Sequence, residues 1–261
     1  MRWSLTPPAV GSQCLPCGTC RTPRAAPDRQ RRIFRFQPLL LALLVFTLLN
    51  FGSDLRAFDA LRMEQAALRQ GSAATLGLKA LQVVLGRAAD QTDEARLDTV
   101  NQFFNRRIQF RSDQEVWGQA DYWASPIELL EKGQGDCEDY VIAKYFSLVA
   151  LGMPTAKLRL VYVRAQLGGE GGVVQAHMVL AYYPTPTTPP APNAAQAEPL
   201  ILDNLISDIR PASRRPDLTP VFSFNSDGLW QGVNGAPDGD PLVRLSRWRE
   251  VVGKAKAEGF L

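Results

Sequence analysis

The sequence predicts an α+β fold in which a helical N-terminal lobe packs on an antiparallel β-sheet. The apolar residues have a helical period up to about residue 152 and alternate as in strands beyond it. The predicted strands follow one another without helices between them, which favours an antiparallel sheet. With 261 residues and 46% hydrophobic content, the chain can bury a core as one domain of two lobes or as two small domains.

Residues 1–53 are predicted to form an N-terminal extension with an export signal. Arg31, Arg32 and Arg35 precede an apolar run, Leu39 to Leu49, that is too short to span a bilayer comfortably as a helix. This pattern is typical of a Sec-type signal and predicts an exported protein, and a buried core helix is the alternative. No clear cleavage site follows the run, so a removed signal and a retained inner-membrane anchor both stay open.

Charge and cysteine content narrow the class of protein. Residues 1–35 hold seven Arg and one Asp, and subtracting their +6 from the formal +3 of the chain leaves −3 for the body. A slightly acidic body without a basic stripe argues against nucleic acid as a partner.

Cys14, Cys17 and Cys20 have metal-like spacing, but no fourth Cys or His lies near, which argues against zinc. If residues 1–30 are removed or never made, Cys137 is the only cysteine of the exported protein, and such an unpaired thiol is either buried and inert or reactive.

Residues 54–152 are predicted to form the helical lobe of a domain that spans 54–261. A helical pattern up to residue 87 is interrupted by Gly71, and an amphipathic helix follows the start signal at Thr92. After a turn-rich segment, a short helix begins at Ser125.

The last helix of this lobe, from about Cys137 to Leu151, begins among acids. Asp136 is a good N-cap, and Glu138 and Asp139 lie in the first turn, where the helix dipole favours carboxylates. The apolar face of this helix is predicted to contain Val141, Ala143, Tyr145, Leu148 and Val149.

Residues 153–261 are predicted to be rich in sheet, with the strands "KLRLVYVRA", "VVQAHMVLAYY" and "PLILDNLI". In the second strand, His177 shares a face with Val179. Residues 184–199 are rich in proline and predict a surface loop. Residues 210–230 show no clear period and are predicted to be irregular, and "LSRWREVVGKAKAEGF" closes the chain as an amphipathic helix.

Cys137 and the single histidine of the chain, His177, predict a nucleophile and its base. A helix N-terminus favours the thiolate, and histidine is the usual group that takes and returns the proton. Asp203 on the following strand is predicted to hold the other imidazole nitrogen; Asn204 is the fallback, although it points to the opposite face. The alternatives are a satisfied core histidine and a small buried thiol.

The acids around Cys137 predict a cation. Asp136, Glu138 and Asp139 would raise the pKa of the thiol and repel a developing oxyanion unless a cation balances them. Hard oxygen ligands of this kind suit Ca²⁺. The alternative is that Asp136 only caps the helix while the other two complement its dipole.

Several stretches together resemble the bacterial transglutaminase-like cysteine proteinases, most closely the LapG type of periplasmic adhesin protease. They lie between residues 95 and 235 and read "WASPIELLEKGQGDCEDYVIAKYFSLVALG", "LRLVYVRA", "AHMVLAYY", "LILDNL" and "RPDLTPVFSFNSDGLW". The resemblance implies a transglutaminase-like (papain-like) cysteine protease fold and a catalytic triad of Cys137, His177 and Asp203. It also implies an acyl-enzyme that water hydrolyses.

The resemblance implies further roles around the nucleophile. LapG-type proteases are calcium-dependent, which favours Ca²⁺ at Asp136 and Glu138, with Asp139 and Asp121 completing the shell. The oxyanion donors implied are the backbone N–H of the nucleophile and a group near Trp123.

The implied substrate is a large surface adhesin, cut near its N-terminus so that cells leave a biofilm. The implied partner is a LapD-like inner-membrane receptor that responds to cyclic-di-GMP. Two other functions stay open: a transglutaminase that passes the acyl group to an amine, and a catalytically inactive binding module of the same fold.

Overall fold

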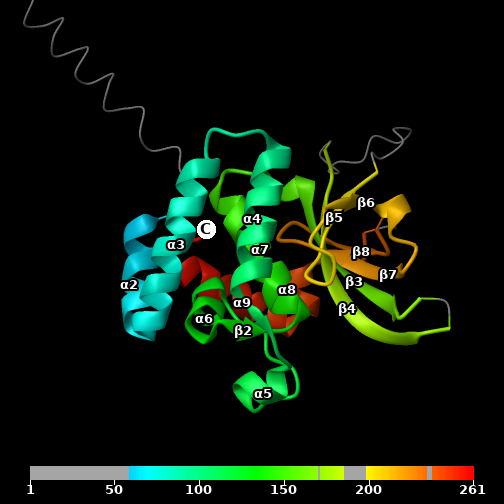
Figure 1. Ribbon diagram of the computed structural model, residues 1–261, viewed down its shortest axis with the longest axis horizontal. Coiled ribbons are helices and arrows are strands. Elements are labelled where there is room, and N and C mark those ends of the chain that lie inside the picture. The colour runs from blue at the N-terminus through cyan, green and yellow to red at the C-terminus, as the bar shows by residue number, and fades with distance from the viewer. Residues whose placement is uncertain (1–58, 170, 185–197, 234–236) are drawn as a thin grey trace, which may run out of the picture. The chain divides into compact units, whose positions relative to one another are not determined.

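The computed structural model describes residues 59–169, 171–184, 198–233 and 237–261 (Figure 1). The predicted N-terminal extension with its export signal and most of the predicted proline-rich loop lie outside these ranges. Among the helices of the described ranges, none is both long enough and apolar enough to cross a membrane.

The helices of the described ranges begin largely where the sequence predicts. Gly71 separates the first two with a φ of 132°, in the region that favours glycine. The Thr92 side chain accepts from the Ala95 N–H, and Ser125 forms a capping box with Glu128. The helices are α2 (Ala60–Gln70), α3 (Ser72–Ala88), α4 (Asp93–Arg107), α5 (Asp113–Trp117), α6 (Pro126–Lys132), α7 (Cys137–Ala150), α8 (Pro241–Arg244), α9 (Ser246–Ala257) and the short 3₁₀ turns η1 (Thr155–Lys157) and η2 (Ala212–Arg214).

The α+β fold class is confirmed, because the helices pack against a six-stranded antiparallel sheet of order β6-β5-β4-β3-β7-β8 (Figure 1). β3 and β4 pair along their whole length, from Leu158 opposite Tyr182 to Leu167 opposite Val173. The strands are β3 (Leu158–Leu167), β4 (Val173–Tyr182), β5 (Leu200–Leu202), β6 (Arg210–Pro211), β7 (Leu218–Phe224) and β8 (Leu229–Gln231), and β1 (Gln109–Phe110) pairs in parallel with β2 (Gln134–Gly135).

α7 is the central helix of the fold. It contacts α4 and α6 as well as β3 and β4 of the sheet. Every residue from Asp139 to Ala150 is buried, including the polar Lys144 and Ser147. The five residues predicted for the apolar face are thus buried, but the burial is not limited to one face, because the sheet and the neighbouring helices cover α7 on all sides.

The prediction that residues 210–230 are irregular is wrong. They contain β6, β7 and β8, and β7 carries Pro220 in its interior. The register between β3 and β7 shifts between Tyr162 and Val163, and Val163 lies opposite the proline. A bulge at this point tolerates a residue without an N–H. Because proline inside a sequence segment argues against a central strand, Pro220 made this strand hard to predict.

The predicted C-terminal helix is present as α9 and returns to the helical layer. Its Trp248 is fully buried, stacks on Phe146 of α7 at 5.6 Å and meets Tyr145 edge to face at 5.5 Å. This contact anchors the helix that carries Cys137 at its amino end.

Candidate active site

Cys137 is the first residue of α7, so its thiol lies where unpaired helix N–H groups favour negative charge. The side chain is partly buried and forms no disulfide. The backbone of Met178 lies near enough to the sulfur to act against the rise in the pKa of the thiol. Because Met178 follows His177 in β4, the packing of α7 on β4 brings the predicted nucleophile beside the predicted base.

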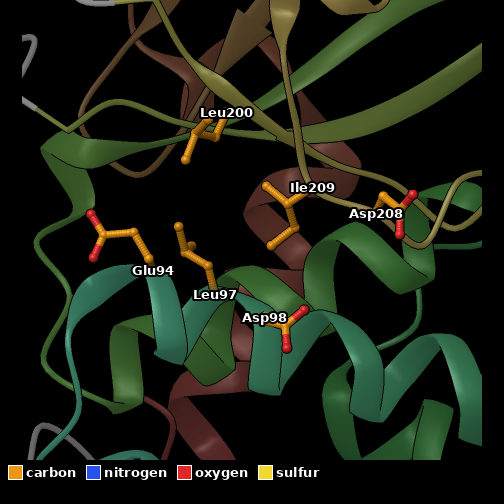
Figure 2. A pocket seen from close by; sticks show the side chains of 6 residues that line it. All are labelled: Glu94, Leu97, Asp98, Leu200, Asp208 and Ile209. Atoms are coloured by element: carbon orange, nitrogen blue, oxygen red, sulfur yellow. The ribbon is translucent and has the colours of Figure 1, made fainter.

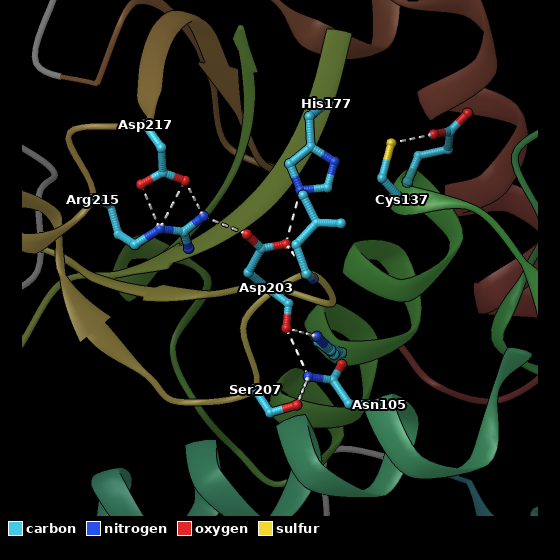
Figure 3. A network of polar contacts seen from close by, with 10 residues as sticks. Asn105, Cys137, His177, Asp203, Ser207, Arg215 and Asp217 are labelled. Atoms are coloured by element: carbon cyan, nitrogen blue, oxygen red, sulfur yellow. Dashed lines mark hydrogen bonds and ion pairs between the residues drawn. The ribbon is translucent and has the colours of Figure 1, made fainter. Parts of the chain in front are cut away.

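His177 and Asp203 form a buried pair. Nε2 of His177 lies 2.8 Å from Oδ1 of Asp203. Because a carboxylate can only accept, Nε2 carries the proton and Nδ1 is left as an acceptor. In Figure 3 this second ring nitrogen faces the side on which Cys137 lies. Pairing of Leu180 with Leu202 places Asp203 next to the histidine, so Asp203 makes this bond and the fallback residue Asn204 does not.

Asp203 is held as a carboxylate. Burial raises its pKa, but hydrogen bonds and charge from His177 and Arg215 outweigh burial and lower the pKa to about 2. Nη2 of Arg215 lies 2.7 Å from Oδ2, and the Leu205 N–H lies 3.1 Å from Oδ1. The sequence did not predict a role for Arg215, since it lies in the region that had seemed irregular.

The backbone of Asp203 is tied to the helices. Nδ2 of Asn105 in α4 and Nζ of Lys144 in α7 lie 2.7 Å and 3.2 Å from its carbonyl oxygen. Asn105 also reaches the Ser207 hydroxyl at 3.5 Å (Figure 3). Burial lowers the pKa of Lys144 to about 7. These contacts fix the loop after β5 against α4 and α7.

An acid cluster of five carboxylates lies beside the thiol. It contains the four predicted metal ligands Asp121, Asp136, Glu138 and Asp139, and also Asp113 of α5. Ligand atoms of Asp113, Asp136 and Asp139 lie within 4.8 Å of one another, as do those of Asp113, Asp121 and Glu138. Sequence reasoning missed Asp113, which the pairing of β1 with β2 brings near α7.

The acid cluster fits a divalent cation. Oδ1 of Asp113 and Oδ1 of Asp136 are buried without a hydrogen-bond partner among the described residues. Burial raises the pKa of Asp113 to about 6, and burial followed by the neighbouring Glu138 raises that of Asp136 to about 8. Buried, unsatisfied and mutually repelling oxygens are the donor set that Ca²⁺ prefers.

Asp139 and Asp121, two of the predicted ligands, already have partners outside a metal shell. Oδ1 of Asp139 accepts from the Ala124 N–H at 2.8 Å, and Oδ2 lies 3.3 Å from the Asp136 N–H. Asp121 is exposed at the surface and lies 2.9 Å from Arg247 in an ion pair. Coordination by either residue would therefore add to, or replace, a contact that already exists.

Without a cation, the acid cluster opposes thiolate formation. Sγ of Cys137 donates to Oε2 of Glu138 at 3.0 Å. Burial, then the charge and hydrogen bond of Glu138, raise the pKa of the Cys137 thiol. The expected effect of the acids on the thiol is thus present in this geometry.

Trp123 precedes α6 and is partly buried. Its ring stacks on Phe224 with centroids 5.9 Å apart. The next N–H, of Ala124, is already bonded to Asp139. An oxyanion donor near Trp123 stays a prediction.

A separate pocket of about 360 Å³ lies between α4 and the β5–β6 end of the sheet (Figure 2). Its lining contains none of the predicted catalytic or metal-binding residues. It is formed by Glu94, Leu97, Asp98, Leu200, Asp208 and Ile209.

Comparison with known proteins gives a consistent result. Residues 81–185 match the family described as bacterial transglutaminase-like cysteine proteinase BTLCP. The structure of LapG from Legionella pneumophila is 35% identical with a TM-score of 0.60, over 75% of this chain and 97% of that chain. Its EGTA-treated form is 36% identical with a TM-score of 0.62, over 75% of this chain and 97% of that chain. Its calcium-bound form is 35% identical with a TM-score of 0.61, over 75% of this chain and 98% of that chain. Among curated protein sequences there is no significant match.

Proposed function

The chain belongs to the bacterial transglutaminase-like cysteine proteinases of the LapG type, and from this membership we propose a calcium-dependent endopeptidase with the triad Cys137, His177 and Asp203. The observation that carries the proposal is the buried bond of 2.8 Å between Nε2 of His177 and Asp203, next to the helix end that bears the only thiol of the described residues.

In the proposed reaction, Nδ1 of His177 takes the proton of the Cys137 thiol while the sulfur attacks the carbonyl carbon of a peptide bond. The carbon–sulfur bond forms as the carbonyl electron pair moves to oxygen. When this oxyanion collapses, the carbon–nitrogen bond breaks and the proton on Nδ1 passes to the leaving amine. The product is a thioester of Cys137.

Water completes the cycle by attacking the thioester as Nδ1 takes one of its protons. Collapse of the second oxyanion breaks the carbon–sulfur bond, releases a carboxylic acid and returns the proton to sulfur. Asp203 keeps the Nε2–H tautomer and stabilises the imidazolium in both halves. The proposed oxyanion donors are the Cys137 N–H, which begins α7, and a group near Trp123.

The proposed calcium ligands are Asp136, Glu138, Asp139 and Asp121, to which the structure adds Asp113. Bound calcium would supply positive charge that offsets the acids beside the thiol and so favours its ionised form. The unpartnered oxygens of Asp113 and Asp136 support this role. The similarity to a LapG that has been captured with calcium bound supports it as well.

The LapG-type membership also supports a proposal for the biological setting. The substrate is the N-terminal region of a large surface adhesin, and its cleavage releases cells from a biofilm. The protein acts in the periplasm, with its N-terminal segment removed or kept as an inner-membrane anchor. Its partner is a LapD-like inner-membrane receptor that responds to cyclic-di-GMP.

Incubation of the purified protein with the N-terminal region of the candidate adhesin tests the proposal. Cleavage is expected with calcium and not with EGTA, and Cys137→Ala and His177→Ala are each expected to be inactive. Mass spectrometry separates the reactions, because a peptidase yields cut peptides, a transglutaminase yields isopeptide links and a binding module yields neither. Near-normal turnover by His177→Ala would contradict the triad.

A further inference from the structure

The guanidinium of Arg215 is buried directly behind the Asp203 carboxylate. The side chains are 1% and 0% exposed. Nη2 lies 2.7 Å from Oδ2 of Asp203, while His177 bonds to the other carboxylate oxygen. Figure 3 shows the three side chains in a row, with Asp203 between the arginine and the histidine. Arg215 therefore does not touch the reacting atoms, but it touches the group that holds the imidazole.

Asp217 aims this guanidinium. Nε of Arg215 lies 3.0 Å from Oδ1 of Asp217, and Nη2 lies 2.8 Å from Oδ2, which makes a bidentate pair. The second N–H of Nη2 remains for Asp203. The carbonyl of Asp217 accepts from the Gln166 N–H of β3 at 2.9 Å, so the pair is anchored to the sheet.

Asp203 depends on this arrangement because a buried carboxylate is costly without donors to both oxygens. Among the described residues, Arg215 supplies the hydrogen bond to Oδ2. If that donor were lost, the carboxyl would take up a proton or turn toward another donor. Either change would weaken the bond that selects the tautomer of His177.

We propose that Arg215, aimed by Asp217, is a positioning residue that fixes the carboxylate of Asp203 against Nε2 of His177. The inference rests on the proposed peptidase function for its kinetic consequence. Its structural consequence, the tautomer of one imidazole, can be measured without substrate.

The tautomer is accessible because His177 is the only histidine of the chain. The full chain without a histidine tag should give one set of imidazole ¹⁵N resonances, with the proton on Nε2 at neutral pH. In Arg215→Gln, a shift toward the Nδ1–H tautomer or a mixture of the two is expected. Arg214→Gln, a change at the exposed neighbouring arginine, should leave the resonances unchanged. A purely structural role for Arg215 would lower stability without changing the tautomer of the folded molecules.

Kinetics of adhesin cleavage give the second readout. Arg215→Gln is expected to lower kcat by about tenfold to a hundredfold, the range for loss of a hydrogen bond between charged groups, with KM within about twofold. Arg215→Lys keeps the charge but cannot form the fork to both acids, so it should recover only part of kcat. Arg214→Gln should retain the wild-type values.

The two readouts separate the possible failures. If wild type does not cleave but Arg215→Gln still changes the tautomer, the peptidase function fails and the positioning role stands. If wild type cleaves and Arg215→Gln matches Arg214→Gln in both tautomer and kcat, the positioning role is overturned. If Arg215→Gln does not fold, Asp217→Asn replaces it, because Asp217 is partly exposed, and an unchanged His177 spectrum in that variant overturns the role equally.

Discussion

A carboxylate and an amide at position 203 would select opposite tautomers of His177. The carboxylate can only accept, so it keeps the proton on Nε2 and leaves Nδ1 free to accept the proton of Cys137. An amide can donate to Nε2, which places the imidazole proton on Nδ1, where it blocks that transfer. The two side chains have nearly the same shape, so this difference is one of chemistry and not of packing.

Asp203→Asn is therefore expected to lower kcat by roughly a hundredfold to ten-thousandfold, as in other triads that lose their acid. Steady-state cleavage of an adhesin-derived peptide with calcium measures it. Asn204→Ala is the matched control, because Asn204 is adjacent and does not bond to His177, and it should keep kcat within about threefold. An Asp203→Asn enzyme as active as this control would contradict the role of Asp203.

Only some residues of the candidate site could be predicted from the sequence. Cys137 and His177 stand out because each is the only residue of its type in residues 54–261, and Asp203 directly follows the predicted strand residues "LIL" that became β5. Arg215 and Asp113 gave no such signal. Their contacts depend on how β7 adds to the sheet and how β1 pairs with β2, and neither pairing leaves a trace in local periodicity.

At the scale of elements, the short strand β2, which ends two residues before Cys137, has no space for a side chain at Gly135. A Cβ there would lie 2.5 Å from Oδ2 of Asp139 and 2.7 Å from Cδ1 of Leu129. Gly135→Ala is therefore expected to lower the free energy of unfolding by about 1–3 kcal/mol and to weaken calcium binding. Urea unfolding in EGTA and a calcium titration measure the two effects.

Gly86→Ala is the control for this change. Gly86 is exposed in α3, and a Cβ there meets no atom within 4 Å. Alanine is the better helix former, so this variant should be more stable by about 1 kcal/mol or less. If Gly135→Ala matched it in stability and calcium affinity, the close contacts at Gly135 would not matter.

The contact between the end of α9 and the start of α6 predicts that the stability of the protein depends on pH. Glu258 accepts from the Ser125 hydroxyl and from the Ile127 N–H, the latter at 3.3 Å. Burial is the main cause that raises its pKa from 4.5 to about 7. Between these values the folded protein holds a proton that the unfolded chain has released, so the contribution of Glu258 to stability falls as the pH rises.

Glu258→Gln removes this titration while keeping the shape of the side chain. The variant is expected to be more stable relative to wild type at pH 8 than at pH 5. Urea unfolding in EGTA measures this as the difference in the free energy of unfolding between the two proteins at each pH. Glu250→Gln on the exposed side of α9 is the control and should show no such change with pH. A difference for Glu258→Gln that is equal at both pH values would contradict the argument.

Elements could be predicted where local chemistry decides them. Thr92, Ser125 and Gly71 mark helix ends through hydrogen bonds and backbone conformations that involve near neighbours. β7 could not be predicted, because Pro220 is tolerated only through a bulge formed with β3, a distant segment. The burial of α7 on all sides could not be predicted for the same reason, since it depends on which elements pack around the helix.

At the scale of the whole molecule, the acid cluster joins three separate segments of the chain between residues 113 and 139. Asp113 comes from α5, Asp121 from the following loop, and the other three members from the start of α7. A cation that binds only the folded arrangement would stabilise it, by about 2.7 kcal/mol at a hundred times its Kd. Calcium is thus expected to act on the stability of the protein as well as on the thiol.

The pKa values of the acid cluster predict whether the stabilisation by calcium grows or shrinks as the pH rises. Without metal, the raised pKa values of Asp113 and Asp136, about 6 and about 8, mean that the folded protein holds protons the unfolded chain has lost. The contribution of these two carboxyl groups to metal-free stability therefore falls as the pH rises from about 4 to 8. Calcium binds the ionised carboxylates, so it must displace these protons and should bind more tightly at higher pH.

The rise in melting temperature on replacing EGTA by calcium is accordingly expected to be larger at pH 8 than at pH 5, as measured by differential scanning calorimetry. Taking the difference at each pH removes contributions that are the same with and without metal, such as that of Lys144. Asp136→Asn should shrink the difference at pH 8, whereas Asp208→Asn, a change at an exposed carboxylate outside the acid cluster, should not. A calcium effect that is equal at both pH values, or larger at pH 5, would mean that the cation does not bind the carboxylates of the acid cluster.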